Sequence, residues 1–555
     1  MQRKLPLPIG NTDYKYICQH NYYVDKTLLI KDILDEGAKI ILFTRPRRFG
    51  KTLNMDMLRT FFEKTDEATD KFFTDKKIWQ QGEEYTKHQG QYPVIYLSLK
   101  DIKAGNWELA FDMLKYIIRT EYSRYNILKQ DKSMALADAE LYDRIITNTA
   151  TESDYSFSLQ ALSRMLHVHY KKAPIIIIDE YDTPIQEGFV NGYYNQAVEF
   201  IRNFFSAALK DNSHLTLSIL TGILRVAKES IFSGLNNIRV FSVLDRRFSD
   251  YFGFTTAEVE AMAAYYGEAD KMQELQAWYD GYKFGSTEIF NPWSVLNYFS
   301  NDCQPMPYWV QTSANTIIKE ILQNYNASTY DNLWRLLCKA SVVSVVETNI
   351  IYPKLKEPQT NILGFLLMTG YLKATRTSLN EDGAYICDLS IPNKEIRTIY
   401  RKEILALLAE GLGENTVTSM QNALLTRDAE RLKHTLRSFM VGTISYYDGL
   451  KENYYQGLLL GLLAVFEHTY NVHSNRESGD GRYDIELSPK KADLPGIIIE
   501  IKAAHKATEL EKLAQAALEQ IETKEYATEL QRNGVRTIYK YGIAFYKKQV
   551  AVVVD

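Results

Sequence analysis

Short apolar runs alternate with segments of helical length through about the first 240 residues of the chain. Four runs rich in β-branched residues are Lys39–Phe43, Pro93–Leu99, Pro174–Asp179 and Leu215–Thr221. Three segments of helical length and spacing are Trp107–Tyr125, Ser156–Tyr170 and Asn195–Leu209. Strands that are apolar on both faces and alternate with helices pair as a parallel sheet that is covered on both sides. The pattern predicts such an α/β domain at the N-terminal end of the chain.

The remainder of the 555 residues shows two further patterns. From about residue 250 to 440 the sequence is mostly helical, with turn-rich interruptions such as "YDGYKFGSTEIFNP". Beyond residue 453 it predicts an apolar helix Tyr454–Tyr470, a Gly-rich turn, two strands, a helix Lys506–Tyr526, and closing strands Val535–Phe545 and Gln549–Val554. Because a chain of this length needs more than one core, we predict an α/β multidomain protein. Its domains are expected at 1–245, 246–440 (a helical lid or linker) and 441–555.

Composition excludes several classes of protein. None of the four cysteines is spaced as C-x-x-C, so neither a zinc ribbon nor a disulfide framework is indicated. The net charge of −4 argues against a chain that is basic throughout, although a local basic groove remains compatible with it. The N-terminus lacks the apolar stretch of a signal peptide, and the longest apolar run, Gly457–Phe466, is too short to cross a bilayer. We therefore expect a cytoplasmic protein that does not bind membranes.

The stretch "FTRPRRFGKTL" (Phe43–Leu53) places Gly-Lys-Thr between an apolar strand and a helix. A phosphate-binding loop reads G-x-x-x-x-G-K-[ST], and here Arg45 occupies the first glycine position. The pair Arg45-Pro46 would instead fix the start of the loop by restricting its backbone angles. We expect the three arginines of the loop to add positive charge where a triphosphate would lie. The alternative is a basic turn that only caps a helix.

A nucleotide reading gives each loop residue a role. Backbone N–H groups at the helix N-terminus would point at the phosphates of ATP. The residues that provide these N–H groups are Arg47, Arg48, Phe49, Gly50, Lys51 and Thr52. The Lys51 ammonium would reach the β- and γ-phosphates, and the Thr52 hydroxyl would ligate Mg²⁺.

A second motif decides between these readings. "IIIIDEYD" (Ile175–Asp182) is an apolar strand that ends in two acids. Asp179 would hold Mg²⁺ through water, and Glu180 would orient the attacking water. Following a Gly-Lys-Thr loop, this pattern favours a P-loop ATPase of the additional-glutamate class. Thr221 ends the next predicted strand, and Arg225 follows it. Thr221 is either a polar sensor near the γ-phosphate or only a strand end, and Arg225 is either a functional residue or a surface arginine.

Three charged residues near the C-terminus form another candidate site. In "GRYDIELSPKKADLPGIIIEIKA" (Gly481–Ala503), Asp484 precedes a hairpin turn, and an apolar strand leads into Glu500-Ile501-Lys502. Residues two apart on a strand share a face, so Glu500 and Lys502 would point into one site. Asp484 would lie across the hairpin, giving two carboxylates for Mg²⁺ or Mn²⁺. The alternative is a surface salt bridge.

Neighbouring residues give weaker signals. Glu477 is either a metal ligand through water or a residue of a solvated turn. Gln520 is either a phosphate contact or part of a solvated helix face. For both residues the solvated position is at least as good a reading. The triplet Glu522-Thr523-Lys524 also matches E-x-K but falls inside a predicted helix, so it is not expected to form a site.

The motifs together resemble those of the bacterial AAA-ATPase-like proteins, which commonly carry a PD-(D/E)XK nuclease-like domain at the C-terminus. The segments that carry the resemblance are "YVDKT", "RPRRFGKT", "IIDEYDTPI", "GILRVAKESIFSGLNN", "WYDGYKFG", "FNPW" and "SIPNKEI". The resemblance implies an AAA-like parallel sheet followed by a restriction-endonuclease-like α/β domain, and Asp484, Glu500 and Lys502 match the nuclease site residue for residue.

The expected function is ATP hydrolysis coupled to metal-dependent cleavage of nucleic acid, in defence against foreign DNA or in DNA processing. The alternative is a nucleotide-dependent switch or scaffold whose nuclease-like domain binds without cutting. The sequence leaves open whether the substrate is DNA or RNA and whether the chain assembles into a homo-oligomer.

Overall fold

The computed structural model describes residues 4–226, 238–309, 341–350, 362–400, 414–443, 452–463, 469–474, 477–478, 481–491 and 494–555, with 332–333, 335–336, 352–353 and 466. Within these, residues of 1–311, 343–356 and 360–395 form one compact unit, and residues of 312–342, 357–359 and 396–555 form another. Each unit is described by itself below. The domain bounds expected from the sequence stay a prediction. None of the described helices has the length and apolar character needed to span a bilayer.

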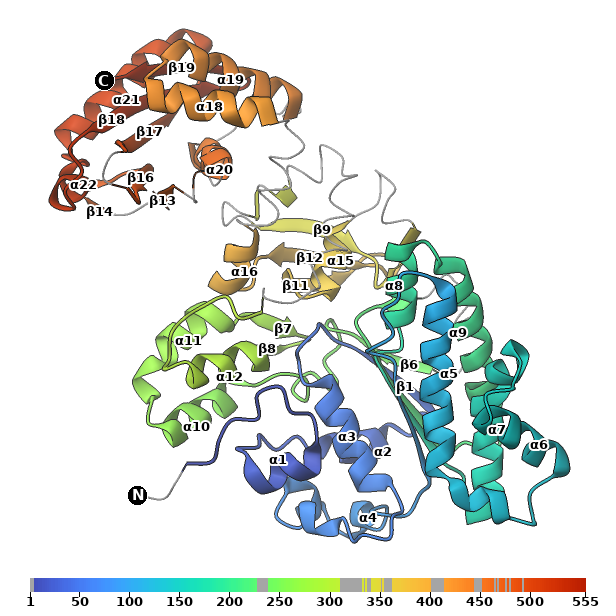
Figure 1. Cartoon of the computed structure of the whole chain (residues 1–555). Helices are drawn as coiled ribbons and strands as arrows, with labels where there is room; N and C mark the ends of the chain where they lie inside the picture. The colour runs from blue at the N-terminus through green and yellow to red at the C-terminus, as the bar shows by residue number, and fades with distance from the viewer. Residues whose placement is uncertain are drawn as a thin grey trace. The chain divides into compact units, whose positions relative to one another are not determined.

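A five-stranded parallel sheet forms the core of the first unit (Figure 1). Its strands are β1 (Ile40–Thr44), β2 (Val94–Ser98), β3 (Ile175–Asp179), β4 (Leu217–Gly222) and β6 (Ile238–Phe241), in the order β2-β3-β4-β1-β6. Every residue of β1, β3 and β4 is buried, as the apolar runs predicted. The α/β fold class expected from the sequence is confirmed. Because all strands are parallel, the carboxyl ends of β1, β3 and β4 meet at one edge of the sheet.

Helices cover both faces of this sheet. Figure 1 shows α5 (Trp107–Arg124), α7 (Glu152–Tyr170) and α9 (Tyr194–Leu209) on one side of the strands and α3 (Lys51–Phe62) on the other. The remaining helices before β4 are α1 (Tyr14–His20), α2 (Leu28–Glu36), α4 (Glu83–Thr86), α6 (Leu136–Ile146) and α8 (Thr183–Asn191). Short 3-10 helices lie at Asp70–Phe72, Lys77–Gln81, Asn126–Gln130 and Ala269–Lys271.

The rest of the first unit combines helices with short strands. The helices are α10 (Thr256–Tyr266), α11 (Met272–Tyr279), α12 (Pro292–Ser300), α15 (Ile362–Met368) and α16 (Lys394–Ile399), the last of which begins at the end of this unit. The strands are β5 (Arg225–Val226), β7 (Tyr282–Phe284), β8 (Thr287–Ile289), β9 (Val342–Val346), β10 (Asn349–Ile350), β11 (Lys373–Leu379) and β12 (Tyr385–Ser390). The described residues of the central region therefore combine helices with a three-stranded sheet, β11-β12-β9, that the sequence pattern did not indicate.

The segment "YVDKT", which carries part of the family resemblance, forms hydrogen bonds to residues far along the chain in this unit. The buried Lys26 of "YVDKT" donates from Nζ to the carbonyl of Asp250 at 2.6 Å and to the Glu258 carboxylate on α10 at 2.6 Å. Burial lowers the pKa of Lys26, and Glu258 opposes that shift. Of the segment "GILRVAKESIFSGLNN", residues 227–237 lie outside the described part of the chain.

A mixed sheet, β13-β16-β17-β18-β19, forms the core of the second unit. The strands are β13 (Tyr470–Ser474), β16 (Ile485–Pro489), β17 (Gly496–Ala503), β18 (Ile538–Tyr546) and β19 (Gln549–Val554), with a small pair β14 (Glu477–Ser478) and β15 (Gly481–Arg482). Its helices are α18 (Glu414–Thr426), α19 (Ala429–Thr443), α20 (Glu452–Leu463), α21 (Leu510–Thr523) and α22 (Thr528–Arg532), with a 3-10 turn at Ala507–Glu509.

The parallel pair β17 and β18 is connected through α21, which packs closely on β18. A Cβ on Gly542 would lie 2.1 Å from the Ala514 carbonyl oxygen of α21, so only glycine fits there. The predicted helix Tyr454–Tyr470 is wrong at its C-terminal end: α20 ends at Leu463, and Tyr470 begins an edge strand. An apolar run of this length does not by itself distinguish a helix from a buried strand.

Candidate functional sites

The loop between β1 and α3 has the backbone shape of a phosphate-binding loop. Arg48 and Gly50 have φ values of 68° and 81°, and α3 begins at Lys51. The buried Lys51 ammonium donates to the carbonyls of Arg45 at 2.9 Å and Pro46 at 3.0 Å. An ammonium has three N–H donors, so one remains for a phosphate oxygen. Burial lowers the pKa of Lys51, and the negative charge of Glu180 makes the largest opposing contribution.

Arg45 does not face the expected triphosphate, so that part of the prediction is wrong. Its side chain is fully buried and donates to the carbonyls of Thr44, Phe241 and Phe248 at 2.8–3.0 Å. The guanidinium also lies over the Phe252 ring, 5.2 Å from its centroid. Arg45 thus ties the start of the loop to the segment after β6.

The other loop side chains connect the loop to the region after the sheet. The Phe49 ring packs on Tyr282 and Phe284 of the β7–β8 hairpin, with centroids 4.9 and 5.2 Å apart. The Arg48 guanidinium lies 3.8 Å from the ring centroid of Trp293, a residue of the "FNPW" segment. Arg47 donates to Gln186 Oε1 at 3.3 Å. The arginines are therefore placed by neighbours as well as by the loop.

A buried acid of "SIPNKEI" supports this arrangement. Glu395 accepts hydrogen bonds from the Ser294 hydroxyl at 2.9 Å and the Trp309 backbone N–H at 2.8 Å. The Trp309 indole N–H in turn donates to the Arg47 carbonyl at 3.3 Å. Burial raises the pKa of Glu395 to about 7, and the positive charge of Arg48 works against that rise. Sequence reasoning attached no role to Glu395, since nothing near it resembles a site.

The strand ends bring three predicted residues together. The Thr52 hydroxyl donates to Asp179 Oδ2 at 2.7 Å, and the Thr221 hydroxyl donates to Asp179 Oδ1 at 2.6 Å. Burial raises the pKa of Asp179, whereas both hydroxyl contacts favour the charged form. Asp179 is thus held at the edge of the sheet with both oxygens bonded.

Glu180 follows in a strained conformation. Its φ of 52° lies in the left-handed region, which costs a non-glycine residue about 1–3 kcal/mol. Its backbone N–H donates to the Thr221 hydroxyl at 3.2 Å, and its carboxylate accepts from the Thr183 hydroxyl at 3.3 Å. Thr221 therefore joins the two acids, which is a direct structural role for this residue. Arg225 lies on β5 rather than on a helix.

Asp182 is a site residue that sequence reasoning missed. Its Oδ2 accepts hydrogen bonds from the backbone N–H groups of Ile223 and Leu224, at 2.8 and 2.9 Å. It fixes the chain immediately after Thr221. Gly222 is required at this point, because a Cβ there would lie 2.8 Å from Asp182 Oδ1. The spacing of "DEYD" would have been the signal.

A cavity of about 300 Å³ adjoins the loop. Gly50, Lys51, Thr52 and Glu180 line it on the loop side. Apolar and aromatic side chains line it elsewhere, among them Tyr22, Val24, Phe254, Trp293 and Leu296. A cavity with backbone N–H groups and a lysine at one side and aromatic rings at another suits a ligand with a phosphate and an apolar ring system.

In the second unit, the hairpin places Asp484 beside the strand that carries the other two predicted residues. β16 and β17 are antiparallel, with Ile485 paired to Ile499, so Asp484 follows on opposite Glu500. Asp484 Oδ2 accepts a hydrogen bond from the Ile501 backbone N–H at 2.8 Å. Lys502 Nζ donates to Glu500 Oε1 at 3.1 Å.

Glu500 is the most constrained member of this group. It is 2% exposed, and Gln520 of α21 also donates to its Oε1, at 2.5 Å. Its other oxygen, Oε2, is buried and has no partner within normal hydrogen-bond geometry among the described residues. Burial, followed by the charge of Asp484, raises the pKa of Glu500 to about 7. Burial raises the pKa of Asp484 to about 6.

Gln520 therefore lies at the site rather than on a solvated helix face. Two residues of α20 that the sequence did not indicate also lie there. Gln456 donates to the Asp484 carbonyl at 3.0 Å. Burial is the main cause of the raised pKa of Asp484, and the charge of Glu452 adds to it. For Lys502, burial lowers the pKa, whereas the charges of Glu500 and Glu452 raise it. One helical turn separates Glu452 from Gln456, so that spacing was the available signal.

The limits of this site are also clear. Glu477 lies on β14, but its side chain lies outside the described part of the chain. Among the described residues, no three His, Cys, Asp or Glu side chains are arranged to hold a metal ion. Glu522, of the second E-x-K triplet, lies in α21, as the predicted helix requires. Its carboxylate pairs with Lys540.

Comparisons with known proteins agree with both units. Residues 8–232 match the family described as "Predicted AAA-ATPase", and residues 450–554 match the "PD-(D/E)XK nuclease superfamily". An uncharacterized protein in the vnfD 5′ region of Azotobacter chroococcum mcd 1 is 27% identical over 333 residues. That match covers 59% of this chain and 58% of the relative. The two matches agree with the arrangement expected from the sequence, an AAA-ATPase-like region followed by a PD-(D/E)XK nuclease-like region toward the C-terminus.

Proposed function

We propose that the first unit binds and hydrolyses ATP. The observation that carries this proposal is the hydrogen-bonded set of Thr52, Asp179 and Thr221 at the edge of the parallel sheet, with Glu180 on the wall of the adjoining cavity. A structural cluster of this kind would not require an acid in a left-handed conformation at the cavity wall.

Each residue then has a defined task. The N–H groups at the start of α3 and the third N–H of Lys51 bind phosphate oxygens, which the helix dipole favours. Mg²⁺ enters with ATP as part of the substrate, and Thr52 and Asp179 are the residues suited to face it. Glu180 orients the attacking water and accepts its proton. The aromatic part of the cavity receives the base.

We propose that the second unit cleaves phosphodiester bonds in nucleic acid with Mg²⁺ or Mn²⁺. The residues present fit a divalent ion, because carboxylate oxygens are hard ligands and Glu500 Oε2 is a buried acceptor that no described residue meets within normal hydrogen-bond geometry. Asp484 and Glu500 would hold the ion, which supplies Lewis-acid activation at the scissile phosphate when bound. Lys502 positions the attacking water and stabilises negative charge on the phosphate.

A specific observation favours a second candidate function. Although Glu452 lies near Asp484, the described residues hold no group of three His, Cys, Asp or Glu side chains arranged to bind a metal ion. A chain with a weakened metal site would act as a nucleotide-dependent switch or scaffold that binds nucleic acid without cutting it.

The proposal extends to the whole chain. Domains at 1–245, 246–440 and 441–555 would act in sequence, with the nucleotide state altering the middle region and thereby the nuclease site. Defence against foreign DNA or DNA processing in the cytoplasm would use such coupling. This biological role rests on architecture alone.

One experiment separates the two candidate functions. Purified protein is incubated with labelled single- and double-stranded DNA and RNA, with and without ATP, Mg²⁺ and Mn²⁺, and both ATP hydrolysis and strand cleavage are measured. Cleavage that needs the metal and is lost in Asp484→Ala supports the nuclease. Binding without cleavage under every condition, with ATP turnover intact, supports the switch.

A further inference from the structure

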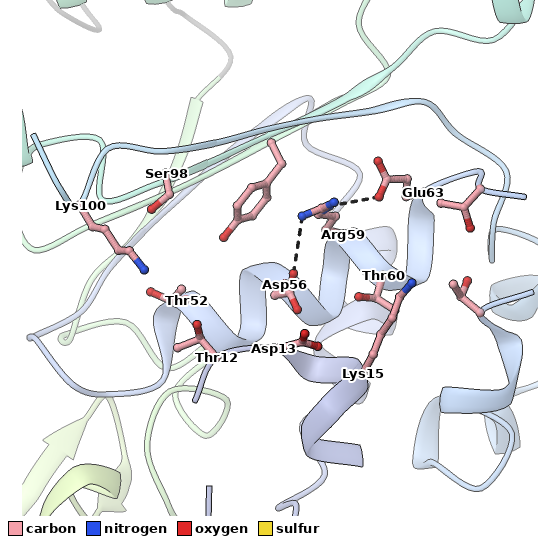
Figure 2. A pocket seen from close by; sticks show the side chains of 13 residues that line it. Thr12, Asp13, Lys15, Thr52, Asp56, Arg59, Thr60, Glu63, Ser98 and Lys100 are labelled. Atoms are coloured by element: carbon pink, nitrogen blue, oxygen red, sulfur yellow. Dashed lines mark hydrogen bonds and ion pairs between the residues drawn. The ribbon is translucent and has the colours of Figure 1, made fainter. Parts of the chain in front are cut away.

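A polar cavity of about 420 Å³ lies beside α3 (Figure 2). It is a different cavity from the one proposed to hold the nucleotide, but Thr12 and Thr52 line both. Because Thr52 is the expected Mg²⁺ ligand, the polar cavity meets the nucleotide cavity where the γ-phosphate would lie. Ser98 and Lys100, at the end of β2, line it at the same end as Thr52.

Three cationic side chains line this cavity, and two of them have carboxylate partners. Arg59 lies 3.1 Å from Glu63, the residue that follows α3, and 3.9 Å from Asp56 on α3. Lys15 lies 3.0 Å from Glu67. Their charges are already offset.

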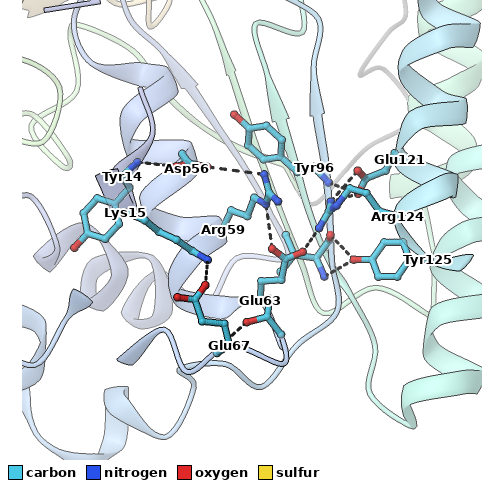
Figure 3. Close-up of polar contacts among 12 residues, drawn as sticks. Tyr14, Lys15, Asp56, Arg59, Glu63, Glu67, Tyr96, Glu121, Arg124 and Tyr125 are labelled. Carbon is cyan, nitrogen blue, oxygen red and sulfur yellow. Dashed lines mark hydrogen bonds and ion pairs between the residues drawn. The ribbon is translucent and has the colours of Figure 1, made fainter. Parts of the chain in front are cut away.

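Figure 3 shows that the Arg59 pair belongs to a longer chain of ion pairs. Glu63 also pairs with Arg124 of α5, and Arg124 lies 2.7 Å from Glu121. This network holds the C-terminal end of α3 against α5. The charge of Arg59 is thus already offset by carboxylates, and Lys100 differs from the other two cations in this respect.

Lys100 is half-buried, and its ammonium has no ion-pair or hydrogen-bond partner among the residues that the structure describes. The backbone holds it close to the acids of β3: Ser98 is paired in register with Asp179, and the Leu99 N–H donates to the Asp179 carbonyl at 2.9 Å. Figure 2 shows the Lys100 side chain extending toward Thr52.

We propose that Lys100 contacts the terminal phosphate of bound ATP and stabilises the charge that develops there during hydrolysis. This inference rests on the proposed ATPase function. In the reaction, the water oxygen bonds to the γ-phosphorus, the bond from that phosphorus to the bridging oxygen of ADP breaks, and the water proton passes to Glu180. Lys100 donates an N–H to a γ-phosphate oxygen and exchanges no electrons.

The geometry explains why a lysine here serves the transition state. A half-buried ammonium without a counterion is more effective than an exposed one, because water screens it less. Lys51 approaches the phosphates from the loop after β1, whereas Lys100 follows the edge strand β2 and lines the polar cavity. ADP lacks the terminal phosphate, so its affinity should not depend on Lys100.

The test compares Lys100→Ala and Lys100→Arg with Lys15→Ala, a matched control whose lysine lines the same cavity but is paired with Glu67. ATP turnover, ADP affinity and the affinity for ADP with aluminium fluoride, a mimic of the transition state, are measured. Lys100→Ala should lower kcat by roughly 10²–10³-fold, the effect of removing one charge-stabilising donor. It should weaken the aluminium fluoride complex by a similar factor, leave ADP affinity within about threefold, and be partly rescued by arginine.

Lys15→Ala should behave as the parental chain does. Turnover within threefold of parental in Lys100→Ala, with an inactive Lys51→Ala variant, would overturn this inference and leave the proposed ATPase intact. A parental chain without ATP turnover would overturn the proposed ATPase, and this inference with it. Equal loss of ADP and transition-state affinity would assign Lys100 a structural role and also overturn the inference. Thermal melting of each variant checks that it is folded.

Discussion

The P-loop site and the nuclease-like site satisfy their buried acids in different ways. In the first, both oxygens of Asp179 accept hydrogen bonds from threonine hydroxyls. In the second, one oxygen of the buried Glu500 has no partner within normal hydrogen-bond geometry in the described part of the chain. The first site is assembled from residues far apart in the sequence, whereas the second is carried by one hairpin and the helices beside it.

This difference teaches what each site requires from its ligand. A buried acid with complete hydrogen bonding is stable in place, and a ligand that binds beside it gains from a preformed arrangement. A buried acid with an unpartnered oxygen carries an uncompensated desolvation cost that a cation would offset. We therefore expect the P-loop site to be ordered without its ligand and the nuclease-like site to be stabilised by its metal.

The largest effect is expected from Lys51→Ala. Removing the ammonium leaves the triphosphate without its charge at the β- and γ-phosphates, so ATP hydrolysis should be lost and ATP affinity should fall at least roughly 100-fold. Isothermal titration and a phosphate-release assay measure both. Melting temperature should change little, since the loop keeps its other contacts; an unchanged turnover would remove the ATPase assignment.

Asp484→Ala or Lys502→Ala should cause a comparable loss of nucleic-acid cleavage without a loss of ATP hydrolysis. Strand cleavage should fall by at least roughly 100-fold because a ligand or the charge at the water is lost, while ATP hydrolysis stays near parental. Lys524→Ala is the matched control, since this lysine is the last residue of the second E-x-K triplet and directly follows α21. Cleavage that survives in both Asp484→Ala and Lys502→Ala would mean that the activity lies elsewhere.

Glu180→Gln tests whether the two sites communicate. It should bind ATP but hydrolyse it slowly, so the chain remains in the ATP-bound state. If the sites are coupled, cleavage should change by roughly 5- to 150-fold, corresponding to about 1–3 kcal/mol. Cleavage rates are compared with ATP, ADP and a non-hydrolysable analogue. A parental rate with every nucleotide would show that the domains are only tethered.

The smallest effect concerns stability and tests the comparison directly. Burial raises the pKa of Glu500 from 4.5 to about 7, so the folded chain holds this proton more tightly than the unfolded chain between those pH values. The free energy of unfolding should therefore fall as the pH rises through this window, by about 1–3 kcal/mol. Glu500→Gln should be more stable than the parental chain at pH 8 and should lack this pH dependence.

Thermal unfolding with EDTA or Mg²⁺ provides the measurement. At pH 8, Mg²⁺ should raise the melting temperature of the parental second unit but not that of Glu500→Gln, because binding to the folded state alone adds stability. Glu522→Gln is the control: its carboxylate belongs to the second E-x-K triplet and is exposed, so its loss should have little effect. No response to Mg²⁺ in the parental chain would contradict the metal site.

Sequence predicted the sheets better than the environment of individual side chains. The four apolar runs became β1 to β4 within about two residues, and the hairpin around Asp484 and Glu500 formed as expected. These features depend on local periodicity and turn residues, which a sequence displays directly.

What the sequence could not supply depends on partners distant in the chain. Arg45 is turned away from the cavity by carbonyls about 200 residues later, at Phe241 and Phe248. Lys100 becomes a candidate for a phosphate contact only because β2 lies beside β3. Glu452 comes near the nuclease-like site only because α20 packs on the hairpin strand β17. No local pattern distinguishes such residues from surface charges, since a contact of this kind is created by the fold.

The placement of two tryptophans gives the protein a built-in optical reporter. Trp293 lies against the Arg48 guanidinium, and the Trp309 indole donates to the Arg47 carbonyl, so both fluorophores contact the phosphate-binding loop. Any ligand that draws Arg48 from its ring changes the surroundings of an emitting group. Intrinsic fluorescence can therefore follow nucleotide association and dissociation in real time with unlabelled protein. Trp293→Phe and Trp309→Phe would assign the signal to one side of the loop or the other.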